Sequence, residues 1–528
     1  MLKRYLKSFI LLTIFYYGEC ANILYVVPFT SRSHNIMLKP IGLELAKRGH
    51  NVTVITGYLE KTSLPNYKQI LIDKKEIWEV LGTRPNVFTM AELSAEEFHD
   101  LIFWRGGLAF TELALNSTEV RKFLAGDNTY DLVISEQFFQ EAMYTLALKY
   151  QAPLVLVTTF GNCMRHNIAF RNPLQLATVI PEFLDLNDPP SFWGRLRTFY
   201  FTYYEFAWWK YWYLVEQEKL AKKYVPGLPE PMPNLYEIQR NVSLFFINSH
   251  FSFDAPVAYL PNVVEIGGVH LTRSSEKLPE DLQSLLDKAK EGVIYVNFGS
   301  NVRSSELPVD KMNALIKVFS ELNHTILWKW EDDKSDLKTK NIVFRKWFPQ
   351  KEVLSHPNIK VFISHGGLIG TQEAIFHGVP IIGVPIYADQ YNNLLQAQHL
   401  GFGKILRFED INEQSLRSKL VDVLFNVSYQ NVAKEMSKRF KDRPMTPLDT
   451  AMYWIEYVIR HNGADFIKNP AIQLSWVAYN MLDVYAFLLV VLLVFLYMII
   501  SVILFFKRYF SSKANAEKSK SSRNKKKN

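Results

Sequence analysis

Short runs of β-branched and aromatic residues alternate with longer amphipathic stretches along the first part of the chain. The runs Asn22-Ile-Leu-Tyr-Val-Val and Asn51-Val-Thr-Val-Ile-Thr are typical of strands, and residues 37–47 between them predict a helix. Further strand-like runs follow at Asp131-Leu-Val-Ile and Leu154-Val-Leu-Val. Because strands that alternate with helices form βαβ units, we expect a parallel sheet with helices on both faces.

The same alternation starts again in the second half of the chain. A polar stretch over residues 271–291 separates the two series and is interpreted as a linker. The pattern predicts an α/β protein with two doubly wound, Rossmann-like domains, over residues 21–275 and 285–445. The strand-like runs of the second series begin at Val293, Ile326, Val361 and Ile381.

The two ends of the chain predict a membrane-anchored protein. Residues 1–20 combine basic residues, an apolar run and small residues, which is typical of a cleaved secretory signal. Residues 485–506 carry no charge and, at ~1.5 Å per residue, are long enough to cross a bilayer as one helix. Residues 446–484 are expected to form a crossover and membrane-proximal helices. The basic tail, residues 507–528, is cytosolic by the positive-inside rule.

The tail also carries a candidate address signal. Lys525 and Lys526 stand fourth and third from the C-terminus, which resembles the dilysine signal that returns type I membrane proteins to the endoplasmic reticulum. We therefore expect a single-pass type I protein of the endoplasmic reticulum membrane with a lumenal body. Glycosylation sequons agree with that compartment; they begin at Asn51, Asn116, Asn241, Asn323 and Asn426.

Charge and cysteine content narrow the function. The chain of 528 residues has a formal net charge of +8, but its last 22 residues hold nine basic residues against one Glu. Residues 21–506 carry 48 basic and 50 acidic groups, so the body has no basic footprint and we expect no nucleic-acid partner. Cys20 is expected to leave with the signal, and Cys163 alone leaves the body without an internal disulfide.

The candidate chemistry lies in the second series. Neither G-x-G-x-x-G at the start of a series nor G-x-x-x-x-G-K-[ST] is present, so a nicotinamide enzyme or a P-loop nucleotidase has no fingerprint here. The segment from Phe362 to Glu373 instead predicts a strand that turns through glycines into a helix. Free amides at that helix start, including Gly367 and Gly370, favour an anion such as a diphosphate, and His365 adds a donor. Glu373, one to two turns along the helix, suits the two hydroxyls of a ribose.

Two flanking segments complete a nucleotide-sugar site. Trp347 and Gln350 set an indole beside an amide, which suits stacking on a base and reading its edge. Asp389 and Gln390 follow a strand and offer two polar groups to sugar hydroxyls. Together, residues 293–406 resemble the donor domain of the UDP-glycosyltransferases. The order of signal, two domains, membrane helix and lysine tail resembles the animal microsomal branch of that family, and insect members in particular.

The resemblance implies a GT-B fold whose second domain grips a UDP-sugar. Ile369 departs from the family pattern, because many relatives carry an asparagine there. Backbone amides must then replace the phosphate contact of that asparagine. The donor residues implied are Trp347 for the uracil, Gln350 for base and ribose, Ser300 and His365 for the diphosphate, Glu373 for the ribose, and Asp389 and Gln390 for the sugar.

The first domain is expected to supply the catalytic base. A histidine titrates near the working pH, at ~6.5 when unperturbed, so it can take the proton of an attacking hydroxyl. His34 lies seven residues past the first strand and just before the predicted helix, at the sheet edge where open α/β folds bind ligands. The strand–Ser–His–helix pattern of the family gives His34 this role. Glu136 stands where the family places the aspartate that orients the base, and its side chain is one methylene longer.

The acceptor is expected in the first domain. Residues 192–213 are rich in Trp and Tyr, and we interpret them as a helix on the lumenal leaflet beside the acceptor cleft. Ordinary core packing of this stretch is the alternative. The predicted reaction is inverting transfer of a hexose, glucose or else glucuronic acid, from UDP to a small lipophilic alcohol or phenol.

Two other functions stay open at this point. One is a lumenal carrier that binds nucleotide sugars without turnover, and the other is a glycosyltransferase of membrane lipids. No metal or other cofactor is expected beside the UDP-sugar, since Asp332 and Asp333 lie in a polar loop and are interpreted as solvated surface. The expected partners are the donor, the acceptor and the lipid bilayer; a homo-oligomer is compatible with the sequence.

Overall fold

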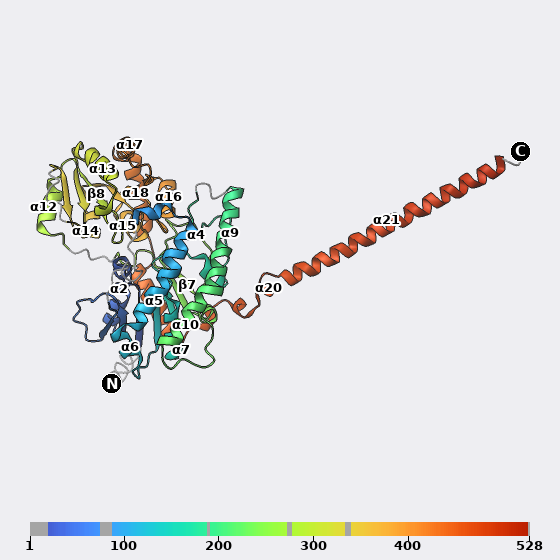
Figure 1. Ribbon diagram of the computed structural model, residues 1–528, viewed down its shortest axis with the longest axis horizontal. Helices are drawn as coiled ribbons and strands as arrows, with labels where there is room; N and C mark the ends of the chain where they lie inside the picture. Colours follow the sequence, from blue (N-terminus) through green and yellow to red (C-terminus); the bar gives the residue numbers. More distant parts are fainter. Residues whose placement is uncertain (1–19, 74–86, 187–190, 272–276, 333–338, 526–528) are drawn as a thin grey trace, which may run out of the picture. The chain divides into compact units, whose positions relative to one another are not determined.

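The computed structural model describes residues 20–73, 87–186, 191–271, 277–332 and 339–525. Nearly all of the predicted signal sequence lies outside the described residues, as do Asp333 and Lys526. The chain forms two compact units, Met1–Asn469 and Pro470–Asn528. The first unit contains two parallel sheets, which Figure 1 shows in separate halves of the ribbon.

The first sheet has seven parallel strands in the order β3-β2-β1-β4-β5-β6-β7. The strand order reverses between β1 and β4, where Val26 pairs with Ser135. Ligands of open α/β sheets bind outside the carboxyl ends of the strands at such a reversal. The strands are β1 (Asn22–Val27), β2 (Asn51–Thr56), β3 (Tyr67–Leu71), β4 (Leu132–Glu136), β5 (Leu154–Val157), β6 (Leu244–Ile247) and β7 (Val263–Glu265).

The second sheet has six parallel strands in the order β10-β9-β8-β11-β12-β13. Its order reverses between β8 and β11, where Asn297 pairs with Ser364. Both sheets therefore offer one reversal at a carboxyl edge, as the predicted pair of doubly wound domains requires. The strands are β8 (Val293–Asn297), β9 (Thr325–Lys329), β10 (Ile342–Arg345), β11 (Ile359–Ser364), β12 (Ile381–Gly383) and β13 (Gly403–Ile405).

Helices cover both sheets, and the inner strands are buried as expected for two-sided coverage. Around the first sheet lie α2 (Arg32–Lys47), η1 (Val87–Glu92), α4 (Ala95–Phe98), η2 (His99–Arg105), α5 (Gly106–Asn116), α6 (Thr118–Leu124), η3 (Glu141–Tyr144), α7 (Thr145–Lys149), α8 (Met164–Phe170), α9 (Phe192–Trp208), η4 (Trp209–Tyr213), α10 (Leu214–Tyr224) and α11 (Leu235–Arg240). Around the second lie α12 (Glu280–Lys288), η5 (Ser304–Glu306), α13 (Val309–Ser320), α14 (Gln350–Leu354), α15 (Leu368–His377), α16 (Gln390–His399), α17 (Glu413–Phe425) and α18 (Val427–Lys441).

Two helix predictions are corrected by the structure. Helix α2 begins at Arg32 and not at residue 37, because Ser31 adopts the extended N-cap conformation and the backbone turns helical at once. His34 therefore lies inside the first turn of α2 and not ahead of the helix. The stretch predicted as a linker contains α12, whose Leu282 and Leu286 are buried in the core of the second sheet. Its polar residues concealed this amphipathic pattern.

The chain crosses between the two halves of the first unit twice. The first crossing precedes α12, and the second leads from α18 to α19 (Pro447–Arg460), whose apolar face packs on the core of the first sheet. Arg48 in the turn after α2 pairs with Asp449 of α19, with an N–O distance of 3.1 Å. The two crossings touch, since Nη1 of Arg443 donates to the carbonyl of Gly267 at 2.8 Å.

The second unit contains η7 (Pro470–Gln473), α20 (Trp476–Tyr479) and α21 (Leu482–Lys525). Figure 1 shows α21 as one uninterrupted helix. Within the described part of the chain, it is the one helix long and apolar enough to cross a membrane, with a mean hydropathy of 3.2 over its most apolar window. The helix is longer than the predicted span 485–506 and continues into the basic tail.

Candidate functional site

A histidine–glutamate pair lies at the strand reversal of the first sheet. Glu136 is the last residue of β4, and His34 follows β1 after one short loop. A hydrogen bond joins Nδ1 of His34 to Oε1 of Glu136, and both side chains are buried. Oγ1 of Thr159 lies 3.1 Å from the same Nδ1 and 3.5 Å from Nε2. Because the carboxylate accepts from Nδ1, it favours the tautomer whose Nε2 can receive a proton.

Phenylalanine rings enclose this pair. The ring centroids of Phe29 and Phe138 each lie 4.7 Å from that of His34, and the centroid of Phe160 lies 5.9 Å away. The cluster continues from Phe160 to Phe183 at a centroid distance of 5.4 Å. Apolar walls with one polar group at their centre are typical of sites for lipophilic ligands.

The reversal of the second sheet carries His365 between two glycine turns. A Cβ added to Gly299, after β8, or to Gly367, before α15, would lie 2.6 Å from the His365 ring. Gly299 also has a φ of +89°, which favours glycine. Burial, with a smaller contribution from Lys329, lowers the pKa of His365 to about 4. The ring is therefore uncharged at neutral pH and can still donate one hydrogen bond.

Sequence analysis did not single out Lys329. This lysine ends β9 and is buried, and its Nζ donates to the carbonyl of Gly299 at 2.8 Å and to Oε1 of Glu331 at 2.7 Å. Lysine is almost never fully buried unless paired, so its place at the end of an apolar strand was the available signal. It sets a cation beside the loop that holds His365.

Gln350 of α14 and Glu373 of α15 are hydrogen-bonded to each other. Gln350 begins α14, and its Nε2 donates to Oε2 of Glu373 at 2.6 Å. Nδ2 of Asn297, which sequence analysis missed, donates to Oε1 of Gln350 at 2.6 Å and so fixes the orientation of the amide. Burial raises the pKa of Glu373 to about 7, although the bond from Gln350 opposes the shift.

Trp347 and Ser300 lie at the surface of the same edge. The Trp347 side chain is 40% exposed, and the guanidinium carbon of Arg32 lies 3.5 Å from the centroid of its ring. Ser300 is exposed and lies beside Asn301. Arg32 precedes His34 by two residues, so the two halves of the first unit meet at this cation–π contact.

Asp389 and Gln390 lie at the start of α16. Oδ2 of Asp389 accepts from Nδ2 of Asn393 at 2.8 Å. Burial raises the pKa of Asp389 to about 6, and His34 is among the groups that favour its charged form. The structure thus brings this carboxylate within electrostatic reach of the imidazole from the other sheet.

Gln390 has only part of its amide free. Its Oε1 accepts from the backbone amides of Ile386 and Tyr387, at 2.8 and 3.1 Å. This leaves Nε2 as the group that can meet a ligand. Ile369 of α15 packs against the apolar core of the first sheet, so the residue that departs from the family pattern makes an apolar contact between the halves. A Cβ at Gly370 would lie 3.3 Å from Nε2 of Gln350.

Stacked aromatic pairs also join the two halves beside these residues. Phe98 of α4 stacks on Tyr387 with centroids 5.6 Å apart, and Phe88 of η1 stacks on Phe408 at 4.9 Å. Such pairs add roughly 0.5–1.5 kcal/mol beyond area burial. The first pair holds α4 against the loop that leads into α16, and the second holds η1 against the segment after β13.

The aromatic stretch, α9 with η4, has one buried face and one exposed face. Its inner face, with Phe201, and Trp209 of η4 are buried in the core. Its outer face exposes apolar and aromatic side chains to 73% at Trp193 and 70% at Tyr211 in η4. Amphipathic aromatic residues of this kind are enriched at membrane–water interfaces.

The remaining candidate residues are the sequon asparagines, Asp332 and Lys525. The sequon asparagines are all exposed; they are Asn51, Asn116, Asn241, Asn323 and Asn426. Asp332 is exposed too, and Lys525 ends α21. Over the described ranges, no group of three or more His, Cys, Asp or Glu side chains is arranged to hold a metal ion.

Sequence and structure comparisons agree with this arrangement. Residues 110–517 match the family described as UDP-glucoronosyl and UDP-glucosyl transferase. A UDP-glycosyltransferase UGT5 of Dactylopius coccus is 34% identical over 482 residues, covering 89% of each chain. The human UDP-glucuronosyltransferase 2B7 is 28% identical over 524 residues, covering 95% of this chain and 96% of its own.

The solved structures establish the fold. Phytolacca americana UGT2, complexed with UDP-2fluoro-glucose and pterostilbene, has a TM-score of 0.55 at 18% identity, covering 83% of this chain and 99% of its own. A Polygonum tinctorium UDP-glucosyltransferase gives 0.56 at 16% identity, with 84% and 99% covered. The two facing Rossmann-like domains are thus those of a GT-B glycosyltransferase. The chain belongs to the UDP-glucuronosyl and UDP-glucosyl transferase family, and it is a UDP-glycosyltransferase that moves a sugar from a UDP-sugar to an acceptor.

Proposed function

We propose that this enzyme transfers a hexose, with glucose ahead of glucuronic acid, to the hydroxyl of a small lipophilic acceptor. The observation that carries the proposal is the His34–Glu136 pair at the strand reversal of the first sheet, ringed by phenylalanines. Glucose is favoured because relatives named UDP-glycosyltransferase and UDP-glucosyltransferase are 34% identical, against 28% for the human glucuronosyltransferase.

In the proposed reaction, Nε2 of His34 takes the proton of the acceptor hydroxyl as its oxygen attacks the anomeric carbon. The C–O bond to the β-phosphate breaks in the same displacement, so the configuration inverts and UDP leaves. Glu136 holds the ring and stabilises the imidazolium that forms. The contribution of the cleft is largely positioning, because both reactants are held in line.

The donor is assigned to the edge of the second sheet. Trp347 would stack on the uracil, Gln350 and Glu373 would contact base and ribose, and the amides of Gly367 to Gly370 would face the diphosphate. His365 and Ser300 would donate to the diphosphate, while Asp389 and Nε2 of Gln390 would hold the sugar. The hydrogen-bonded pair Gln350–Glu373 supports a single ligand spanning both groups.

We propose the endoplasmic reticulum membrane as the site of this reaction. Helix α21 would cross the bilayer with the body in the lumen and the basic tail in the cytosol. The exposed aromatic face of α9 would rest on the lumenal leaflet, from which lipophilic acceptors can enter the cleft. No metal or other cofactor is proposed.

A donor-by-acceptor screen of microsomal protein tests the proposal, with products identified by mass spectrometry and anomeric configuration by NMR. UDP-glucose with planar phenols is expected to give the largest product signal, in inverted configuration. Product confined to sterol or ceramide acceptors would favour the membrane-lipid alternative. Retained configuration would contradict direct displacement.

A further inference from the structure

Two neighbouring asparagines at the start of α16 contact different halves of the enzyme. Asn393 stays within the donor half, where its Nδ2 donates to the carbonyl of Gly366 at 3.0 Å and to Asp389 at 2.8 Å. Nδ2 of Asn392 instead lies within hydrogen-bond distance of three backbone carbonyls of the acceptor half. These are Pro181 at 3.2 Å, Glu182 at 3.3 Å and Leu184 at 3.2 Å.

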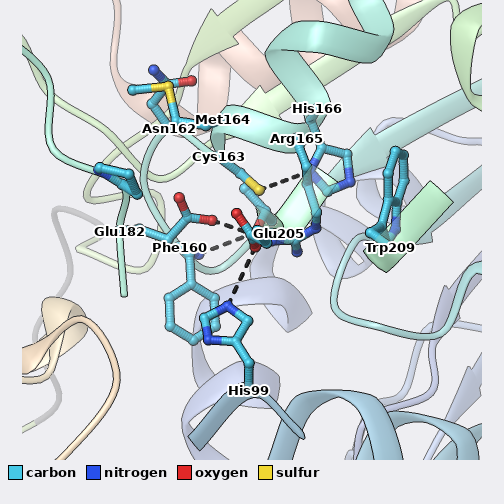
Figure 2. Close-up of polar contacts among 12 residues, drawn as sticks. His99, Phe160, Asn162, Cys163, Met164, Arg165, His166, Glu182, Glu205 and Trp209 are labelled. Carbon is cyan, nitrogen blue, oxygen red and sulfur yellow. Dashed lines mark hydrogen bonds and ion pairs between the residues drawn. The ribbon is translucent and has the colours of Figure 1, made fainter. Parts of the chain in front are cut away.

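The segment that receives Asn392 is anchored in a buried charged cluster. Figure 2 shows Glu182 facing Arg165. Nη1 of Arg165 also contacts Glu205, and Glu205 in turn contacts His99. The N–O distance from Arg165 is 3.5 Å to Glu182 and 2.6 Å to Glu205, and His99 lies 3.3 Å from Glu205. Glu205 and Arg165 are almost completely buried. Breaking such a buried pair is costly, so the segment has a fixed place in the acceptor half.

The same segment is also fixed to the wall around His34. Phe183, between two of the three carbonyls, packs on Phe160, and Phe160 in turn contacts the His34 ring. On the other side, Asn392 follows Asp389 and Gln390 after one intervening residue. Asn392 therefore joins the helix that begins at the proposed sugar-binding pair to the loop that lines the base.

We propose that Asn392 is a positioning residue that docks α16 on residues 181–184 and thereby sets the distance between the donor sugar and His34. The proposal rests on the proposed function of His34, Asp389 and Gln390. It differs from donor binding itself, because UDP contacts are assigned to residues of the second sheet that Asn392 does not touch. A displacement of about 1 Å in such a cleft can cost about 100-fold in rate.

The chemistry of the contact supplies a sharp set of variants. Asn392→Asp keeps the shape but removes both N–H donors and places an acceptor against three carbonyl oxygens. Asn392→Gln keeps the amide on a longer side chain. Gln398→Ala is the matched control, since Gln398 lies on the same helix and is exposed, and its side-chain oxygen accepts from Ile405 of its own half, at 3.1 Å.

The test measures UDP binding by calorimetry and steady-state kinetics on the full-length protein in detergent. Asn392→Asp is expected to lower kcat/KM for the acceptor by roughly 10–100-fold, while the Kd for UDP stays within about twofold of wild type. Asn392→Gln should recover part of the loss, and Gln398→Ala should match wild type.

Three outcomes would overturn the inference. Wild-type kcat/KM in Asn392→Asp would show that the contact does not position the reactants. A parallel loss of UDP affinity and turnover would show a merely structural role. If wild-type protein binds no UDP, the proposed function fails first and the inference falls with it, which separates the two failures.

Discussion

Nδ1 of His34 is hydrogen-bonded to the carboxylate of Glu136, although the two residues are 102 positions apart in the sequence. The pair forms because β1 and β4 are neighbours at the reversal of strand order, so both carboxyl ends reach one point. Glu136 keeps the regular register of β4, since it pairs with Val157 of β5, and its side chain reaches His34 from there.

Removing the proposed base should abolish transfer while leaving donor binding intact. His34→Ala is expected to lower kcat by roughly 10²–10⁴-fold, because the acceptor proton then has no receiver. Glu136→Gln should lower kcat in the same direction, because a neutral amide does not stabilise the imidazolium. Turnover and UDP calorimetry are the measurements. His399→Ala, an exposed histidine at the end of α16, is the control, and wild-type turnover in His34→Ala would contradict the assignment.

Loss of the exposed indole should weaken nucleotide binding. Trp347→Ala is expected to raise the Kd for UDP by about 5–150-fold, since stacking of a base on an aromatic ring is worth ~1–3 kcal/mol. Trp347→Phe should retain part of the affinity. The measurement is titration calorimetry with UDP. Unchanged affinity in Trp347→Ala would place the base elsewhere.

Uridine affinity should rise with pH through about 7. Burial raises the pKa of Glu373 to about 7, and only its charged form accepts from both ribose hydroxyls. Above that pH the carboxylate is present before binding, whereas below it the proton must first leave. Calorimetry between pH 6 and 8 with uridine avoids titration of phosphate. Glu373→Gln should flatten the profile, and an unchanged slope in that variant would assign it to other groups.

The raised pKa of Glu373 also makes the stability of the protein depend on pH. Because the folded pKa of Glu373 exceeds the usual 4.5, the folded state binds more protons than the unfolded state between these values. The contribution of this group to the free energy of unfolding therefore falls as pH rises from about 4.5 to 7. Glu373→Gln should remove this part of the pH dependence of Tm.

Gly299→Ala should weaken UDP binding through the clash of its methyl group with His365, in addition to the loss of stability from backbone strain. Gly299→Ala places a Cβ 2.6 Å from His365 at a φ of +89°. Gly49→Ala is the matched control, because its φ is +98° and no atom lies within 4 Å of the new Cβ. Both should lose stability, typically more than ~1 kcal/mol, but only Gly299→Ala should weaken UDP binding. Equal UDP affinities in the two variants would contradict the placement of His365.

Much of the fold was readable because its signals are local. The strand-like runs at Asn22, Asn51 and Leu154 became β1, β2 and β5 with the predicted starts. The start of α2 was missed because Ser31-Arg-Ser-His34 has no apolar periodicity, while the capping conformation of Ser31 depends on the backbone alone. The helix α12 was missed because polar residues fill most of its surface.

The candidate site was predictable from the sequence only where one segment contains several of its residues. The stretch from Phe362 to Glu373 displays its strand, glycines and helix in order, so His365 and Glu373 could be named. Thr159, Lys329 and Asn392 could not, since each acquires its place from a partner far along the chain. The hydroxyl and the amide have no local pattern that reveals such a partner, and for Lys329 the one available signal was its place at the end of an apolar strand.

The double crossing ties the two halves of the first unit together at one place. Because the crossings are bonded through Arg443 and Gly267, a change in the angle between the halves would have to be accommodated by both connecting segments together. The spacing between His34 and the sugar-binding residues proposed on α16 therefore depends on the path of the chain at Gly267 and Arg443 as well as on the site residues themselves.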